Sequence, residues 1–95
     1  MKNEAAIEAR IRNLAWSFKA LKNAPGVDPW NALELDRWAE SGTTSSGERQ
    51  AARFVLSVWN RHDWGKKFNM ADAVNVWDEK NLKAFQAWVN DPWYA

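Results

Sequence analysis

Few residues in this chain are suited to acid–base or nucleophilic chemistry. The 95 residues include one histidine, His62, and no cysteine. A serine nucleophile would need His62 as its base, and no serine stands at a position that recommends it as the partner. An acid–base site needs titratable groups that converge, whereas the carboxylates here are scattered over expected helix starts and solvent faces. The sequence therefore predicts a protein that is not an enzyme.

The sequence supports metal binding and phosphate binding hardly better than it supports catalysis. His62 and Asp63 could supply two metal ligands, but no second histidine or cysteine completes a familiar set. The loop over residues 41–47 places small residues ahead of a helix start, a position that attracts anions. No lysine follows in the spacing that a P-loop requires. We therefore expect no metal and no cofactor.

Tryptophan is the residue type that distinguishes this chain. Eight of the 95 residues are tryptophan. Each indole has about 150–250 Å² of buriable surface and one N–H that needs a partner. A chain of this length buries only about 60–65% of its surface when it folds. Either tryptophan builds much of the core, or some indoles lie on the surface where a partner can bind them.

The strongest binding signal lies on the back of the first expected helix. Trp16 falls about 180° from Ile7 on the helical wheel. Its neighbours on that side include Ala9, Asn13 and Ala20. This face is either covered by another helix of the chain or free to bind a partner. Alanine permits close approach and tryptophan is a frequent interface anchor, so we predict a protein-interaction domain that self-associates here, most simply as a homodimer.

The C-terminal residues form a second candidate interface. Trp93 and Tyr94 follow Pro92 and stand at a chain end, where disorder is the default. Either Trp93 folds back and closes the bundle, which we favour, or the tail is a short recognition peptide.

The alternative function is a weak nucleic-acid-binding module. Five positive charges and one negative charge lie between residues 49 and 67, and the indole of Trp64 could stack on a base. The net charge of the chain is only +1, whereas strong nucleic-acid binders usually carry a clearly basic domain. An enzyme, or a pocket in which indole faces stack on a small aromatic or carbohydrate ligand, ranks third. The residues of this alternative site are Arg49, Arg53, Arg61, Trp64, Lys66 and Lys67.

The elements that position these residues are expected to be helices throughout. Apolar residues recur at helical spacing, and we find no convincing period-2 alternation. The expected helices cover residues 4–23, 29–40, 46–61, 70–77 and 79–90. Asp28, Ser45, Asn69 and Asp78 can cap the later four, and Ser45 forms a capping box with Glu48. The last two could instead be one kinked helix, but we favour a break near Asp78.

The third helix is expected at the centre of the bundle, because its apolar residues cover an arc of about 200°. Its polar face would include Gln50 and Ser57 together with the arginines. His62 to Lys67 reads as a turn in which Gly65 can take a positive φ.

These elements predict an all-α fold, a compact orthogonal bundle of four to five short helices with a Trp-rich core, in a single domain over residues 1–95. The sequence has no signal-like N-terminus and no apolar stretch long enough to span a membrane, so we expect a cytoplasmic protein without membrane contact. The residues expected to be largely buried are Ile11, Leu14, Phe18, Leu35, Trp38, Val55, Trp59, Trp77, Phe85 and Trp88.

Overall fold

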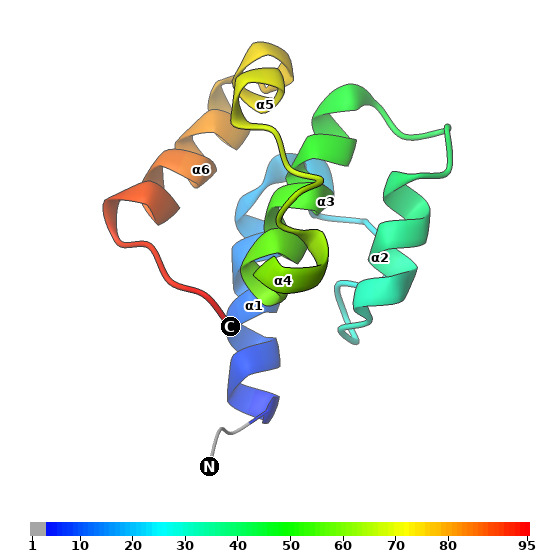
Figure 1. Ribbon diagram of the computed structural model, residues 1–95, viewed down its shortest axis with the longest axis vertical. Helices are drawn as coiled ribbons and strands as arrows, with labels where there is room; N and C mark the ends of the chain where they lie inside the picture. The colour runs from blue at the N-terminus through cyan, green and yellow to red at the C-terminus, as the bar shows by residue number, and fades with distance from the viewer. Residues whose placement is uncertain (1–3) are drawn as a thin grey trace.

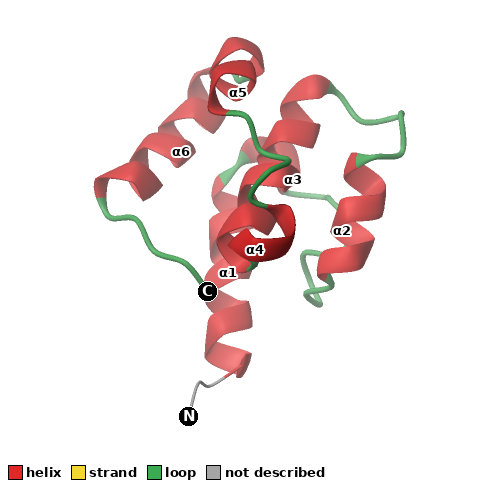
Figure 2. Cartoon of the chain, viewed as in Figure 1, coloured by secondary structure: helices red, strands yellow, loops and turns green. Residues whose placement is uncertain are grey.

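A computed structural model describes residues 4–95 of the chain. Within this range six α-helices and one short 3-10 turn form the fold and no strand is present, which confirms the predicted all-α bundle (Figure 1, Figure 2). The elements in chain order are α1 (Glu4–Ser17), η1 (Lys19–Leu21), α2 (Ala32–Ala39), α3 (Ser46–Trp59), α4 (Arg61–Trp64), α5 (Met70–Val76) and α6 (Glu79–Asn90).

Helix α3 is the central element, and the other helices lie around it (Figure 1). Every residue from Gln50 to Val58 is buried except Arg53, which is half-buried. The predicted polar face was therefore wrong for Gln50 and Ser57. Ser57 Oγ donates to the Phe54 carbonyl at 2.6 Å, so its hydroxyl is satisfied inside the helix itself. Neighbours on all sides leave α3 without the free polar side that its sequence suggested.

The tryptophans mostly surround the core rather than fill it. Phe54 lies at the centre of an aromatic cluster, with ring centroids 5.1–6.4 Å from those of five other rings. These separations are typical of favourable aromatic pairs. Trp77 is buried at 7% exposure. Six further tryptophans are half-buried and pack against the core: Trp30, Trp38, Trp59, Trp64, Trp88 and Trp93.

The predicted core is confirmed at six positions, which are Ile11, Phe18, Leu35, Val55, Trp77 and Phe85. Leu14, Trp38, Trp59 and Trp88 are only half-buried. An indole is too large to be enclosed at every such site in a small domain. Leu14 has a local reason as well. It lines an open hollow of about 350 Å³ between α1 and α6, where Ala84 and Ala87 are too short to cover it.

Five helices begin with the same capping arrangement. A side-chain oxygen of the N-cap residue accepts a hydrogen bond from the backbone N–H three residues later, which satisfies one of the free donors of the first turn. The predicted caps Asn69 and Asp78 are confirmed, and so is the Ser45–Glu48 capping box. Trp77 is extended, with φ −76° and ψ 138°, so the break between α5 and α6 is also confirmed.

Two predicted boundaries need correction. Helix α1 ends at Ser17, because Phe18 is extended and its side chain is buried in the core. Helix α2 begins at Ala32 with Asn31 as its cap, not at Pro29 with Asp28. Asp28 Oδ1 instead lies 3.9 Å from Arg12 Nε.

The stretch expected to be a plain turn contains α4, capped by Asn60. A helix of one turn is too short to show a periodic pattern. Gly65 follows with φ −58°, not the positive φ that we expected. Glycine is needed there for another reason, since a Cβ would collide with the carbonyl oxygen of Arg61. No helix within residues 4–95 is long and apolar enough to cross a membrane.

Candidate functional site

The outer face of α1 is open to solvent. Ile11 and Ala15 point into the core, and Trp16 is 39% exposed. It is the one tryptophan of the eight that is exposed, whereas the other seven are buried or half-buried. The chain therefore covers this side only in part. The structure leaves part of a large indole in contact with water.

The predicted neighbours of Trp16 divide into two groups. Ala9 and Asn13 lie within about 60° of Trp16 on the α1 wheel, so they share its side of the helix. Asn13 is exposed and Ala9 is half-buried. Ala20 does not belong with them, because α1 ends before it. The N–H of Ala20 donates to Asn81 Oδ1 at 3.2 Å, and the residue lies beside α6.

The C-terminal tail folds back onto the bundle, which confirms the interpretation that we favoured. The Arg10 guanidinium lies 4.0 Å from the centre of the Trp93 ring. Trp88 Nε1–H donates to the Trp93 carbonyl at 3.0 Å, and the Ala95 N–H donates to the Val58 carbonyl at 2.9 Å. These contacts tie the tail to α1, α3 and α6 at once.

Tyr94, the second aromatic residue of the tail, remains 51% exposed. Its ring makes an edge contact with Trp88, with centroids 5.5 Å apart. The Arg61 guanidinium lies 5.0 Å from the Tyr94 ring centre. Trp93 thus packs against the core of the bundle, whereas about half of the Tyr94 surface remains exposed to solvent.

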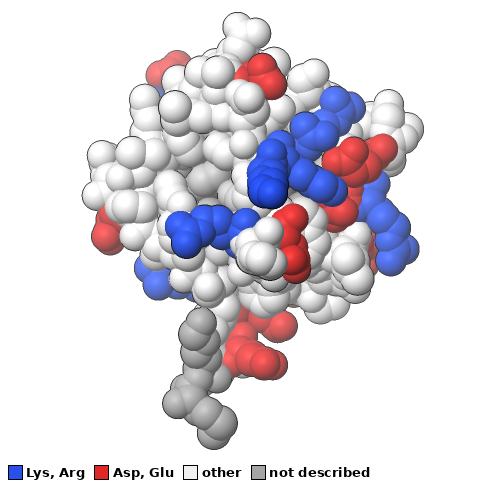
Figure 3. Space-filling view, in the orientation of Figure 1, with Lys and Arg blue, Asp and Glu red and all other residues white. Residues whose placement is uncertain are grey.

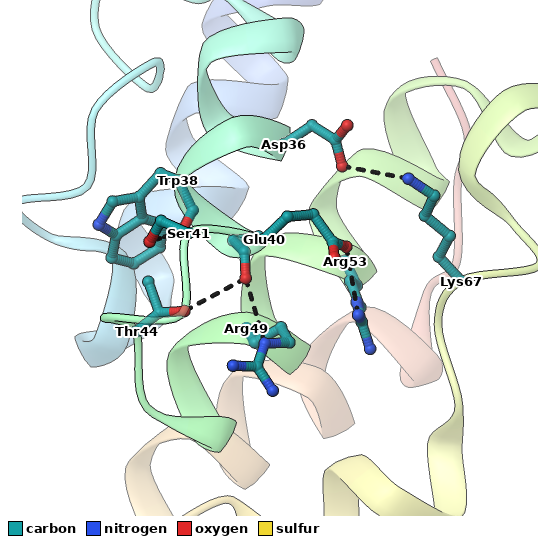
Figure 4. Close-up of polar contacts among 9 residues, drawn as sticks. Asp36, Trp38, Glu40, Ser41, Thr44, Arg49, Arg53 and Lys67 are labelled. Atoms are coloured by element: carbon teal, nitrogen blue, oxygen red, sulfur yellow. Dashed lines mark hydrogen bonds and ion pairs between the residues drawn. The ribbon is translucent and has the colours of Figure 1, made fainter.

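Two arginines of the predicted basic site hold α2 against α3 (Figure 4). Arg49 Nε donates to the Ala39 carbonyl at 3.1 Å, and Thr44 Oγ1 donates to the same oxygen at 3.2 Å. Arg53 Nη2 donates to Glu40 Oε1 at 3.2 Å. The last carbonyl groups of a helix lack intrahelical donors, so Arg49 and Thr44 satisfy the end of α2.

The other predicted nucleic-acid contacts do not form one free surface. Lys67 Nζ lies 3.5 Å from Asp36 Oδ1, and Trp64 packs against the core. Arg61 is engaged with Tyr94, and Lys66 is exposed. Figure 3 shows basic side chains across the middle of this face with acidic ones among them, below a largely uncharged area over α5 and α6. Most of the basic side chains are therefore paired within the chain.

His62 and Asp63, which were weighed as possible metal ligands, have different surroundings in the structure. Asp63 Oδ2 accepts from Asn60 Nδ2 at 2.9 Å, so this carboxylate is part of the α4 cap. His62 borders an open hollow of about 520 Å³ with Arg61 and Tyr94. Within residues 4–95, no group of three or more histidine, aspartate or glutamate side chains is placed to hold a metal ion.

Sequence analysis did not find a polar groove between α3 and α5. Its walls are a stripe of α3 at residues 46, 49, 50 and 53 and a stripe of α5 at residues 72, 75 and 76. The spacing in α3 is that of one helical face, but the sequence does not say which element faces it. Comparison of the chain with protein-family models, with curated proteins and with solved structures finds no match.

Proposed function

We propose that this protein is a non-catalytic protein-interaction domain that forms a homodimer through the outer face of α1. The observation that supports the proposal is the exposure of Trp16. The seven other tryptophans lie in the core or pack against it, whereas Trp16 keeps 39% of its surface in water. Removing large apolar surface from water is favourable at about 25 cal/mol per Å², and a second copy offers a surface that removes it.

An antiparallel pair of α1 helices about a two-fold axis matches the layout of this face. Trp16 and Ala9 are seven residues apart, which is about 10 Å along the helix. Antiparallel pairing places the indole of each copy over the small side chain of Ala9 in the other. A symmetric dimer is the commonest homo-oligomer, and it makes the same contact twice.

Charges along the edge of the face fit the same arrangement. Glu8 and Arg12 lie one turn apart, about 80° and 40° from Trp16 on the same side. Antiparallel pairing brings Glu8 of one copy towards Arg12 of the other. In a parallel two-fold pair the charged edges of the two copies would lie on opposite sides of the interface, so Glu8 of one copy would not approach Arg12 of the other. The edge charges therefore favour the same direction of pairing as the Trp16–Ala9 contact.

The proposed interface is small. A helix of 14 residues is about 21 Å long, and pairing along one such helix buries less than the ~1,600 Å² of a standard interface. We expect a weak dimer, with a dissociation constant on the order of 100 μM.

The test compares two lysine substitutions at exposed apolar residues. Trp16→Lys places a charge in the proposed interface, and Leu33→Lys places the same charge on α2, where Leu33 is 61% exposed. We expect sedimentation velocity to show dimer formation by the wild type and Leu33→Lys from about 10 μM to 1 mM. Trp16→Lys should stay monomeric and keep its helical circular dichroism. A wild type that remains monomeric at the highest concentration, or two variants with the same affinity, would contradict the proposal.

A further inference from the structure

The groove between α3 and α5 has hydrogen-bonding capacity that the fold does not use. Gln50 is buried at 7% exposure, and its Oε1 has no hydrogen-bond partner. Arg53 Nε, one turn further along α3, is also buried and without a partner. Buried polar atoms normally have partners in the protein or in bound water. Both residues line the same hollow of about 310 Å³, so a reorientation of either side chain would bring an unpaired acceptor or donor to its surface.

The two walls of the groove carry opposite charges. Arg49 and Arg53 lie on the α3 wall, and Asp72 lies on the α5 wall. Within residues 4–95, no ion pair joins Asp72 to either arginine. The contact between Arg49 and Ala39 uses only Nε, and the terminal nitrogens of its guanidinium point away from that carbonyl (Figure 4). Arg53 is paired through Nη2 with Glu40, which does not line the groove, whereas Arg49 has no carboxylate partner within residues 4–95. Arg49 is therefore the cation that faces Asp72 across the groove without a carboxylate of its own.

The positive wall is reinforced by the start of α3. Ser46 is the first residue of the helix and lines the groove. The first turn of an α-helix has free N–H groups and a partial positive charge. Asp72 and the Val76 carbonyl end of α5 lie on the other wall. One side of the groove is therefore suited to an anionic group and the other to an ammonium group.

We propose that this groove binds a free α-amino acid. Its carboxylate would contact Arg49 and Arg53, and its ammonium group would donate to Gln50 Oε1 and to Asp72. The terminal amide of glutamine has a broad torsional preference, so Gln50 can turn its oxygen towards the ligand at little cost. The hollow has the volume of about ten water molecules in the liquid, which leaves room for a side chain.

The inference does not depend on the α1 dimer, because α1 contributes no residue to the groove. It differs from a plain anion site in one respect. Both an unpaired acceptor and a carboxylate lie on the groove, and they would oppose an anion that brings no N–H donor. The experiment must therefore compare the binding of an amino acid with the binding of a carboxylate alone and of an ammonium group alone.

Nuclear magnetic resonance titration of the full chain provides the test. L-serine, L-glutamine and L-leucine are the probes, and acetate and methylammonium represent the two halves. Trp77 Nε1–H is a useful reporter, because it donates at 3.1 Å to the carbonyl of Gly47 in the first turn of α3. We expect saturable shifts confined to residues 46–53 and 72–77, with a dissociation constant of about 1 mM for at least one amino acid. Each half alone should bind at least about tenfold more weakly.

Two substitutions test the residues themselves. Gln50→Leu keeps much of the side-chain volume and removes the acceptor, and Gln86→Leu is its control at an exposed position of α6. We expect Gln50→Leu to weaken binding at least about tenfold and Gln86→Leu to leave it unchanged. Asp72→Asn, at an exposed position, repeats the test if Gln50→Leu does not fold. No saturable shift up to about 50 mM, acetate binding as tightly as the amino acids, or unchanged binding by the folded variants would each overturn the proposal.

Discussion

Trp16 and Trp93 show how the same side chain has different fates in two regions of one molecule. Both were candidates for an interface on sequence grounds. Trp93 lies under the Arg10 guanidinium, and its carbonyl accepts from the Trp88 indole. Trp16 projects from the outer face of α1, and 39% of its surface is exposed.

The difference follows from the backbone that carries each indole. A residue in the middle of a helix has its direction fixed by the helical phase, so Trp16 points away from the core as long as Ile11 and Ala15 point inward. A residue in an irregular tail can be turned by its backbone towards whatever surface receives it. An aromatic residue on the solvent-facing side of a well-anchored helix is thus stronger evidence for a binding surface than an aromatic residue near a chain end.

The largest expected effect concerns the stability of the monomer. Trp93→Ala removes a half-buried ring that packs against the core, and we expect a loss of about 2–3 kcal/mol of unfolding free energy, less than for a fully buried indole. Trp16→Ala should change it by less than about 0.5 kcal/mol, as surface substitutions usually do. Urea melts at about 5 μM, well below the expected dimer concentration, provide the measurement. Equal losses of unfolding free energy in the two variants would contradict the claim that Trp93 stabilises the monomer and Trp16 does not.

A smaller effect is expected where α1 holds the tail. Arg10→Ala removes the cation above the Trp93 ring and should cost about 0.5–1 kcal/mol, because the site is solvent-exposed. It should also raise the mobility of the Trp93 indole, measured by its heteronuclear Overhauser effect. Arg12→Ala is the matched control, since the Arg12 guanidinium lies near Asp28 and not near the tail. A tail that responds equally to both changes would show that the Arg10–Trp93 contact is not what orders it.

The smallest effect is expected at the edge of the outer face of α1. Glu8→Arg should weaken the proposed dimer about threefold, and adding Arg12→Glu should restore it, because exposed ion pairs contribute less than about 1 kcal/mol. Sedimentation at low salt provides the measurement, and about 0.5 M salt should reduce the difference. If the double variant dimerises no better than Glu8→Arg, the antiparallel arrangement is wrong even where the Trp16 contact is right.

Local patterns predicted most of the fold because most helix boundaries are set locally. Ser45, Asn69 and Asp78 were recognised as caps, since the capping bond needs only the residue and the N–H three positions later. The end of α1 was missed for a non-local reason. Phe18 leaves the helix and places its ring 5.6 Å from Phe54 and 5.3 Å from Trp77, residues far away in the sequence.

The candidate sites were predictable only to the level of helix faces. The wheel placed Trp16 opposite the core side of α1, but whether another helix covers it depended on tertiary packing. The groove at Gln50 was missed because α3 was expected to expose that side, whereas α5 packs beside it. The arginines were correctly placed together on α3, but no local pattern indicated that the end of α2 would engage Arg49 and Arg53.

The central position of α3 also affects how the molecule responds to thermal motion. Helices α1, α2, α4 and α5 all contact α3. Helix α6 reaches it through Phe85 and Trp88, whose ring centres lie 5.1 Å from that of Phe54. No helix can move away without exposing part of this shared surface to water, so we expect the amides of α3 to exchange with solvent mainly when the whole chain unfolds. A domain of this kind behaves as one cooperative unit, and a partner bound at one surface therefore slows the unfolding of every helix.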